Sequence, residues 1–140
     1  MNQKLPKLNL LFCVLILFII TSVNASQGNL KVTGIFSSMK YVEESEDVVG
    51  LEVLVTYADA GNSPTGSYYI VFQSAEGSTS VPVVARATMS GNFIEFEIPK
   101  NDHGFDGVFK GEITKTTLRG TFAKNPQLKI VLRRGKSYWQ

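Results

Sequence analysis

The sequence predicts an all-β domain, an antiparallel meander of about eight strands that forms a small up-and-down barrel or a flattened sandwich. From residue 30 onward, apolar and polar residues alternate with period two along most of the chain. Short clusters of glycine, proline, asparagine, aspartate and serine separate these stretches and mark turns. We find no amphipathic helical stretch of useful length in this part, so a sheet is expected throughout.

The N-terminal segment 1–25 is predicted to be a secretory signal peptide. Two lysines precede the apolar run 8–23, and Val-Asn-Ala at 23–25 is an A-x-A-like cleavage site. We therefore expect a single all-β domain over 26–140, exported to the periplasm or secreted. An uncleaved segment that stays as a membrane anchor is the alternative; after cleavage no integral membrane domain is expected.

Cysteine is confined to the predicted signal peptide. Cys13 is the only cysteine, so the exported domain would contain none. Its absence from that domain excludes thiol catalysis, thiolate-bound zinc and a disulfide scaffold. We expect no metal and no cofactor, and a fold held together by packing and strand pairing.

The first half of the predicted domain has a strand at each alternating stretch. The strand 30–36 leads into an acidic connection, 41–49, which lacks the carboxylate spacing and mid-loop glycine of a calcium loop and is expected to be solvated. The strand 51–57 alternates cleanly and ends at the turn-rich segment 58–66. The strand 68–73 is apolar on both faces, which is typical of a central or covered strand.

Two further strands precede the last meander. A turn at 76–78 leads to the strand 81–89, and Pro82 removes one donor from its ladder. The beginning of that strand is therefore expected at an edge or a bulge. A turn at 90–92 then leads to the strand 93–98, whose isoleucines and Phe96 are predicted to face inward.

The segment 105–134 is predicted to hold three strands, and its first hairpin can be placed in register. If Lys115 and Thr116 form a two-residue turn, four facing pairs match in character, namely Phe109–Phe122, Gly111–Gly120, Glu112–Arg119 and Ile113–Leu118. Lys-Thr suits a primed turn poorly, so a longer loop with a shifted register is the alternative. The facing glycines would let the sheet bend sharply or let the phenylalanines lie over bare backbone.

Charge is divided unevenly along the chain. From Glu43 to Asp106 there are 11 acidic and two basic residues, whereas from Gly107 to Gln140 there are eight basic residues and one acidic residue. Pairing between acidic and basic strand faces is the favoured explanation, and a dedicated anion-binding surface is the alternative. We expect no nucleic-acid partner, because the aromatic residues of the basic half fall on the inner face.

Catalysis is not expected. His103 is the only histidine and lies in a predicted loop with Asp102 and Asp106 close in sequence. No nucleophile motif accompanies it. A small hydrolase using His103 remains an alternative, and it requires the imidazole to lie in a cleft beside a second titratable group.

A binding function is expected, either inside the barrel or on its surface. A barrel of this size fills its interior with its own side chains or holds one small apolar ligand. The candidate lining is aromatic: Phe36, Tyr57, Phe96, Phe109 and Phe122. The number of these rings favours a packed core, whereas the inward glycines leave room for a ligand.

Surface aromatic residues offer a second place to bind a partner. The candidates for recognition of a protein are Tyr69, Tyr138 and Trp139. For the last two, the alternative is a tail that clips across an open barrel end. An interaction or inhibitor module predicts a filled barrel with a protruding loop, such as 58–66.

The C-terminal pattern carries a resemblance. It reads Gly111-x-Ile113, Leu118-x-Gly120-x-Phe122, Leu128-x-Ile130-x-Leu132 and Arg134-Gly135-Lys136-Ser137-Tyr138-Trp139. This run resembles the ending of small exported bacterial proteins of uncharacterised function, which implies export and no particular activity. In architecture the chain is similar to lipocalin-like barrels and to small periplasmic lysozyme inhibitors. It lacks the Gly-x-Trp of the former and the disulfide and Ser-Gly-x-x-Tyr motif of the latter.

Overall fold

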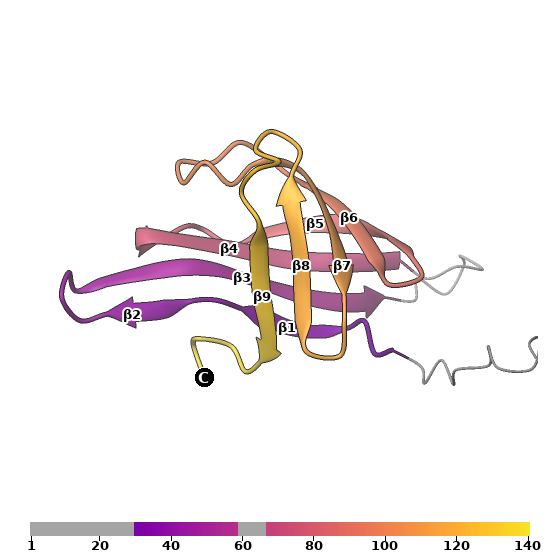
Figure 1. Ribbon diagram of the computed structural model, residues 1–140, viewed down its shortest axis with the longest axis horizontal. Helices are drawn as coiled ribbons and strands as arrows, with labels where there is room; N and C mark the ends of the chain where they lie inside the picture. The colour runs from indigo at the N-terminus through magenta and orange to yellow at the C-terminus, as the bar shows by residue number, and fades with distance from the viewer. Residues whose placement is uncertain (1–29, 59–66) are drawn as a thin grey trace, which may run out of the picture.

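One antiparallel sheet closes on itself in the computed structural model, which describes residues 30–58 and 67–140 (Figure 1). The strands are β1 (Gly34–Ser37), β2 (Lys40–Val42), β3 (Asp47–Ala58), β4 (Ser67–Thr79), β5 (Val83–Ser90), β6 (Phe93–Ile98), β7 (Gly107–Ile113), β8 (Thr117–Phe122) and β9 (Ile130–Gly135). Neighbours in sequence pair from β3 through β9, and β1 pairs with both β9 and β3. The all-β prediction is confirmed, and this closure gives an eight-stranded barrel rather than an open sandwich.

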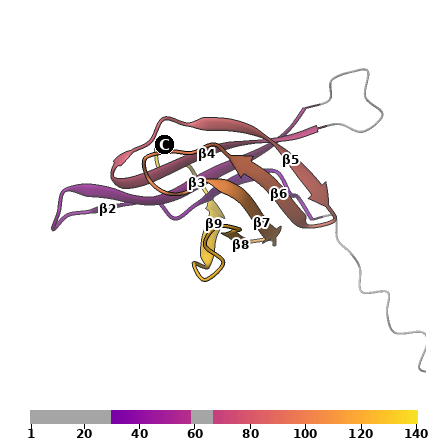
Figure 2. The same cartoon turned by 90° about the horizontal axis from the view of Figure 1, so that it is seen from above.

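A three-stranded ribbon extends from one side of the barrel. β3 and β4 are the longest strands, and β2 adds to the outer part of β3 (Figures 1 and 2). The turn predicted at 76–78 lies at the end of β4. Gly77 still pairs with Val48, and the chain reverses between Ser74 and Ser80, because the Ser80 backbone N–H donates to the Ser74 carbonyl oxygen at 2.7 Å. Gly77 lies midway between these two serines, and its positive φ of 86° is a conformation that glycine adopts readily in turns.

The predicted acidic connection is shorter than expected. Only residues 43–46 form the turn, because Tyr41 and Val42 belong to β2 and Asp47 begins β3. The run of acidic residues around the turn interrupts the alternation of apolar and polar residues, so β2 and the start of β3 were not recognised as strands in the sequence. The ribbon therefore ends in a tight, strongly acidic tip.

The register predicted for the β7–β8 hairpin is confirmed at all four pairs. Thr114 explains how Lys115 and Thr116 make the turn without positive φ angles. Its Oγ1 accepts hydrogen bonds from the backbone N–H groups of Thr116 and Thr117, at 3.3 and 3.0 Å. This side-chain cap replaces the Asn-Gly chemistry of a primed turn.

The facing glycines let an aromatic ring lie on bare backbone. A Cβ at Gly120 would come within 2.5 Å of the Phe109 ring and 2.3 Å of the Lys110 carbonyl oxygen. A Cβ at Gly111 would come within 2.6 Å of the same ring. Both glycines are therefore required by close packing, as predicted for Phe109.

The barrel interior is filled by aromatic and branched side chains. Phe109 stacks on Phe96 at 4.8 Å between ring centroids and meets Phe122 edge-on at 5.4 Å. Phe72 in turn meets Phe122 edge-on, with centroids 6.1 Å apart, so the four rings form one connected cluster. Isoleucine, leucine and valine side chains that are at most 7% exposed complete the core. Contacts of this kind are typical of a packed core.

Arg134 packs on the core at one end of the barrel. Its guanidinium lies 4.4 Å from the ring centroid of Phe36 and donates to the carbonyl oxygens of Thr33 at 2.7 Å and Lys31 at 2.6 Å. Burial lowers the pKa of Arg134. Gly34 has a φ of 137°, and a Cβ there would come within 2.6 Å of the guanidinium. Arg134 thus ties the segment before β1 to the end of β9.

Candidate functional site on the outer faces of the barrel

The predicted barrel lining divides into four buried rings and one exposed ring. Phe36, Phe96, Phe109 and Phe122 are at most 4% exposed and belong to one core cluster. Placing Tyr57 inside the barrel is wrong, because its side chain is 48% exposed. It lies on β3 beyond the last residue paired with β1 and instead packs edge-on against Tyr68, with centroids 5.1 Å apart.

The described part of the chain is hollowed in at least two places that open to solvent. One, of about 540 Å³, lies over β7 and β8 and is bordered by Phe93 of β6 and Val131 of β9. The other, of about 250 Å³, is bordered by Leu30, Lys31, Lys115 and Arg134 at the end of the barrel. The interior positions proposed for a ligand border neither of them.

An apolar row crosses the outer face of four strands. Strand pairing aligns Ile35 of β1 with Leu54, Leu54 with Val71, and Val71 with Val84 of β5. Their apolar neighbours along each strand belong to the core or pack against it, so the side chains of the row point outward. Leu54 is 37% exposed and Val84 is 69% exposed. We call Ile35, Leu54, Val71 and Val84 the outer apolar row.

Tyr69 flanks one side of the outer apolar row. It lies on β4 two residues before Val71, on the same face, and pairs in register with Arg86 of β5. The Arg86 guanidinium lies 5.8 Å from the tyrosine ring centroid and donates to its hydroxyl oxygen at 3.4 Å. This hydrogen bond raises the pKa of Arg86. The contacts restrain the orientation of this half-buried ring.

The C-terminal tail flanks the other side of the row. Ser137 Oγ and the Tyr138 backbone N–H donate to the two carboxylate oxygens of Glu52, at 2.6 and 2.9 Å. Trp139 Nε1 donates to Gln73 Oε1 at 3.0 Å, and its ring is 56% exposed. Glu52 and Gln73 are a facing pair on the outer surface of β3 and β4. The tail is a clip, as in the alternative interpretation, but it crosses the outer face rather than a barrel end.

The three surface residues predicted for recognition therefore lie on one face. Tyr69, Val71 and Gln73 alternate along β4, so the tyrosine and the glutamine that holds Trp139 are about 13 Å apart. Tyr138 packs edge-on against Trp139 at 4.9 Å. We call these three aromatic residues and the outer apolar row the aromatic face. The outer apolar row was not predicted from the sequence, although Leu54 and Val71 are apolar residues at outward positions of their strands.

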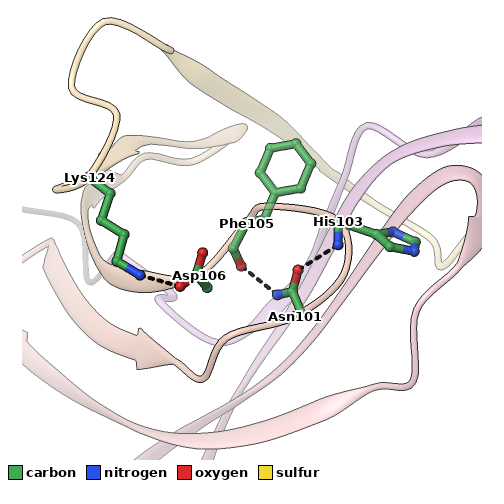
Figure 3. A network of polar contacts seen from close by, with 5 residues as sticks. All are labelled: Asn101, His103, Phe105, Asp106 and Lys124. Carbon is green, nitrogen blue, oxygen red and sulfur yellow. Dashed lines mark hydrogen bonds and ion pairs between the residues drawn. The ribbon is translucent and has the colours of Figure 1, made fainter.

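The loop around His103 is organised by an asparagine rather than by the histidine ring. Asn101 accepts a hydrogen bond from the His103 backbone N–H at 3.0 Å and donates to the Phe105 carbonyl oxygen at 2.8 Å (Figure 3). Asp106 forms an ion pair with Lys124, and the His103 ring points away from both (Figure 3). Among the described residues, Nδ1 of His103 is buried without a hydrogen-bond partner. No second titratable group in the described ranges forms a hydrogen bond with the His103 ring, as a hydrolase would require.

Some sequence predictions concern residues outside the described ranges, and others concern metal binding and membrane insertion. The predicted signal peptide, 1–25, and residues 59–66 of the predicted protruding loop lie outside the described residues. In residues 30–58 and 67–140 there is no grouping of three or more histidine, cysteine or acidic side chains suited to a metal ion. No helix of these two ranges is long and apolar enough to span a membrane.

Comparisons with protein families, with curated proteins and with solved structures give no match.

Proposed function

We propose that this chain is an exported, non-enzymatic binding protein that recognises a protein partner through its aromatic face. The observation that carries the proposal is the convergence of Tyr69, Tyr138 and Trp139 around exposed aliphatic side chains on one side of the barrel. Exposed aromatic residues next to aliphatic ones are the usual anchors of protein interfaces. The resemblance of the C-terminal run to small exported proteins agrees with this placement outside the cell interior.

Preorganisation of the tail supports the same proposal. Glu52 and Gln73 hold the tail by three hydrogen bonds before any partner arrives. A side chain that is already ordered loses little conformational entropy on binding. Trp139 nevertheless keeps 56% of its surface exposed, so it retains area to bury against a partner.

The two alternative functions have less support. A small apolar ligand inside the barrel would have to displace packed rings such as Phe96 and Phe109. A hydrolase centred on His103 would need a carboxylate or a nucleophile in contact with the ring. A filled barrel is, in contrast, what an interaction or inhibitor module requires.

The experiment is a comparative capture from the exported proteins of the native host. Wild-type protein is immobilised beside the double variant Leu54→Ser with Val84→Ser, and beside the control Leu128→Ser. Leu128 is 44% exposed and lies before β9, away from the aromatic face. We expect one partner to be captured by wild type and by the control, and about tenfold less by the double variant.

A second variant separates the aromatic anchors from the aliphatic row. Trp139→Ala removes the exposed ring and leaves the barrel core intact, so it should also weaken capture of the same partner. Equal capture by wild type and by both variants of the aromatic face would refute the proposal. Thermal unfolding of each variant checks that the barrel remains folded.

A further inference from the structure

A second surface, on β6 to β9, forms a groove across the strands. Its floor is the backbone of Gly111 and Gly120, whose side-chain positions face the Phe109 ring in the core and not the groove. One wall is the outward row Phe93, Glu112, Arg119 and Val131, aligned by strand pairing. The other wall contains Lys110, Thr121 and Lys129. We call this hollow of about 540 Å³ the basic groove.

The basic groove has an excess of positive charge. Lys110 pairs with Glu95 at 3.0 Å, and Glu112 accepts a hydrogen bond from Asn92 Nδ2 at 2.6 Å. Arg119 and Lys129 line the groove and form no ion pair with a carboxylate of the described ranges. These two cations are therefore available to an anionic partner.

The acidic tip of the β2–β3 ribbon is the complementary feature. Glu43, Glu44 and Glu46 are exposed in the turn, and Asp47 follows directly as the first residue of β3. None of the four forms an ion pair with a described residue. Tyr41 lies beside the tip and is 51% exposed. The ribbon carries this tip past the body of the barrel (Figures 1 and 2).

We propose that the acidic tip of one copy docks in the basic groove of a second copy. The chain itself supplies both halves of the complementary pair, and residues 26–140 carry equal numbers of acidic and basic side chains. A molecule with little net charge and with opposite charges at separate places attracts its own copies. Phe93 and Val131, 60% and 48% exposed, give the groove apolar contacts for Tyr41.

The contact is head-to-tail. The tip and the groove are different surfaces of one chain, so each docked copy still offers a free tip and a free groove. Repetition of the contact produces open chains or rings. The contact depends on exposed charges, so it weakens as the screening length falls from about 10 Å at 0.1 M salt to about 3 Å at 1 M.

Sedimentation velocity of the purified protein tests the proposal. In about 20 mM salt, the weight-average mass should rise with protein concentration, and in about 1 M salt it should equal that of one chain. The tip variant carries Glu43→Lys and Glu44→Lys, and the groove variant carries Arg119→Glu and Lys129→Glu. Each variant alone should be monomeric in low salt.

Mixing the two variants provides the decisive comparison. The reversed tip of one then faces the reversed groove of the other, so association should return in the mixture. The control variant, Glu97→Lys with Asp102→Lys, changes the same charge at exposed positions away from the tip and should associate as wild type does. Monomeric wild type in low salt, or a mixture that stays monomeric, would overturn the proposal. Association lost in the groove variant but kept in the tip variant would also overturn it, because another acidic segment would then be the occupant.

Discussion

Replacing Phe109 by alanine should open a cavity in the centre of the barrel. Phe109 is 2% exposed and contacts the rings of Phe96 and Phe122 at 4.8 and 5.4 Å. It also covers the bare backbone of Gly111 and Gly120. The glycines contribute no side chain that could move into the space, so the site cannot collapse easily.

The expected loss of stability follows from this geometry. Phenylalanine-to-alanine changes in a core cost about 3–5 kcal/mol, and the upper part of that range applies where the surroundings relax little. Domains of this size have a free energy of unfolding of about 5–15 kcal/mol. If the wild-type free energy of unfolding lies above the lower end of this range, the Phe109→Ala variant should remain folded in water. Its urea denaturation midpoint should be much lower than that of wild type.

Equilibrium unfolding in urea, followed by circular dichroism, measures the change. Phe93→Ala is the matched control, because Phe93 is 60% exposed and its truncation should change stability by no more than about 0.5 kcal/mol. A small aromatic compound such as benzene should raise the melting temperature of Phe109→Ala and leave that of wild type unchanged. A loss below about 1 kcal/mol, or equal stabilisation of wild type by benzene, would refute the packed interior.

Two further predictions concern the barrel end and the tail. Arg134→Lys loses the forked hydrogen bonds to two backbone carbonyl oxygens. It should reduce the free energy of unfolding, measured by urea titration, by about 1–2 kcal/mol. The control is Arg133→Lys, a change at the exposed neighbouring residue, which should have no measurable effect. Glu52→Ala removes the carboxylate that holds the tail, so the fluorescence anisotropy of Trp139, the only tryptophan, should fall; unchanged anisotropy would show that the clip does not order the ring.

Local pairing chemistry is what made much of the barrel predictable. The β7–β8 register followed from matching facing residues, because a slip by one position would have exposed Ile113 and Leu118 to water. The facing glycines and the ring over them followed from the same alignment. The turn was the uncertain part, since the capping role of Thr114 depends on its hydroxyl orientation and not on a Gly or Asn signal.

Features set by long-range contacts were harder to predict. Tyr57 continues the inward parity of β3, yet the neighbouring strand β1 begins too late to cover it. The ribbon was missed because pairing between β2 and the start of β3 overrides the acidic composition around the tip. The aromatic face depends on contacts between Trp139 and β4 across 66 positions of sequence, which periodicity cannot reveal.

The central claim is that the barrel interior is filled and that a protein partner binds the outer surface. Native mass spectrometry of the protein purified from its own host tests this claim most directly. We expect the mass of the chain without any small apolar molecule, together with a protein complex that is lost when Leu54 and Val84 are both changed to serine. A bound small apolar molecule that is lost when Phe109 is changed to a polar residue, with no effect of the Leu54 and Val84 changes, would contradict this prediction and place the binding site inside the barrel.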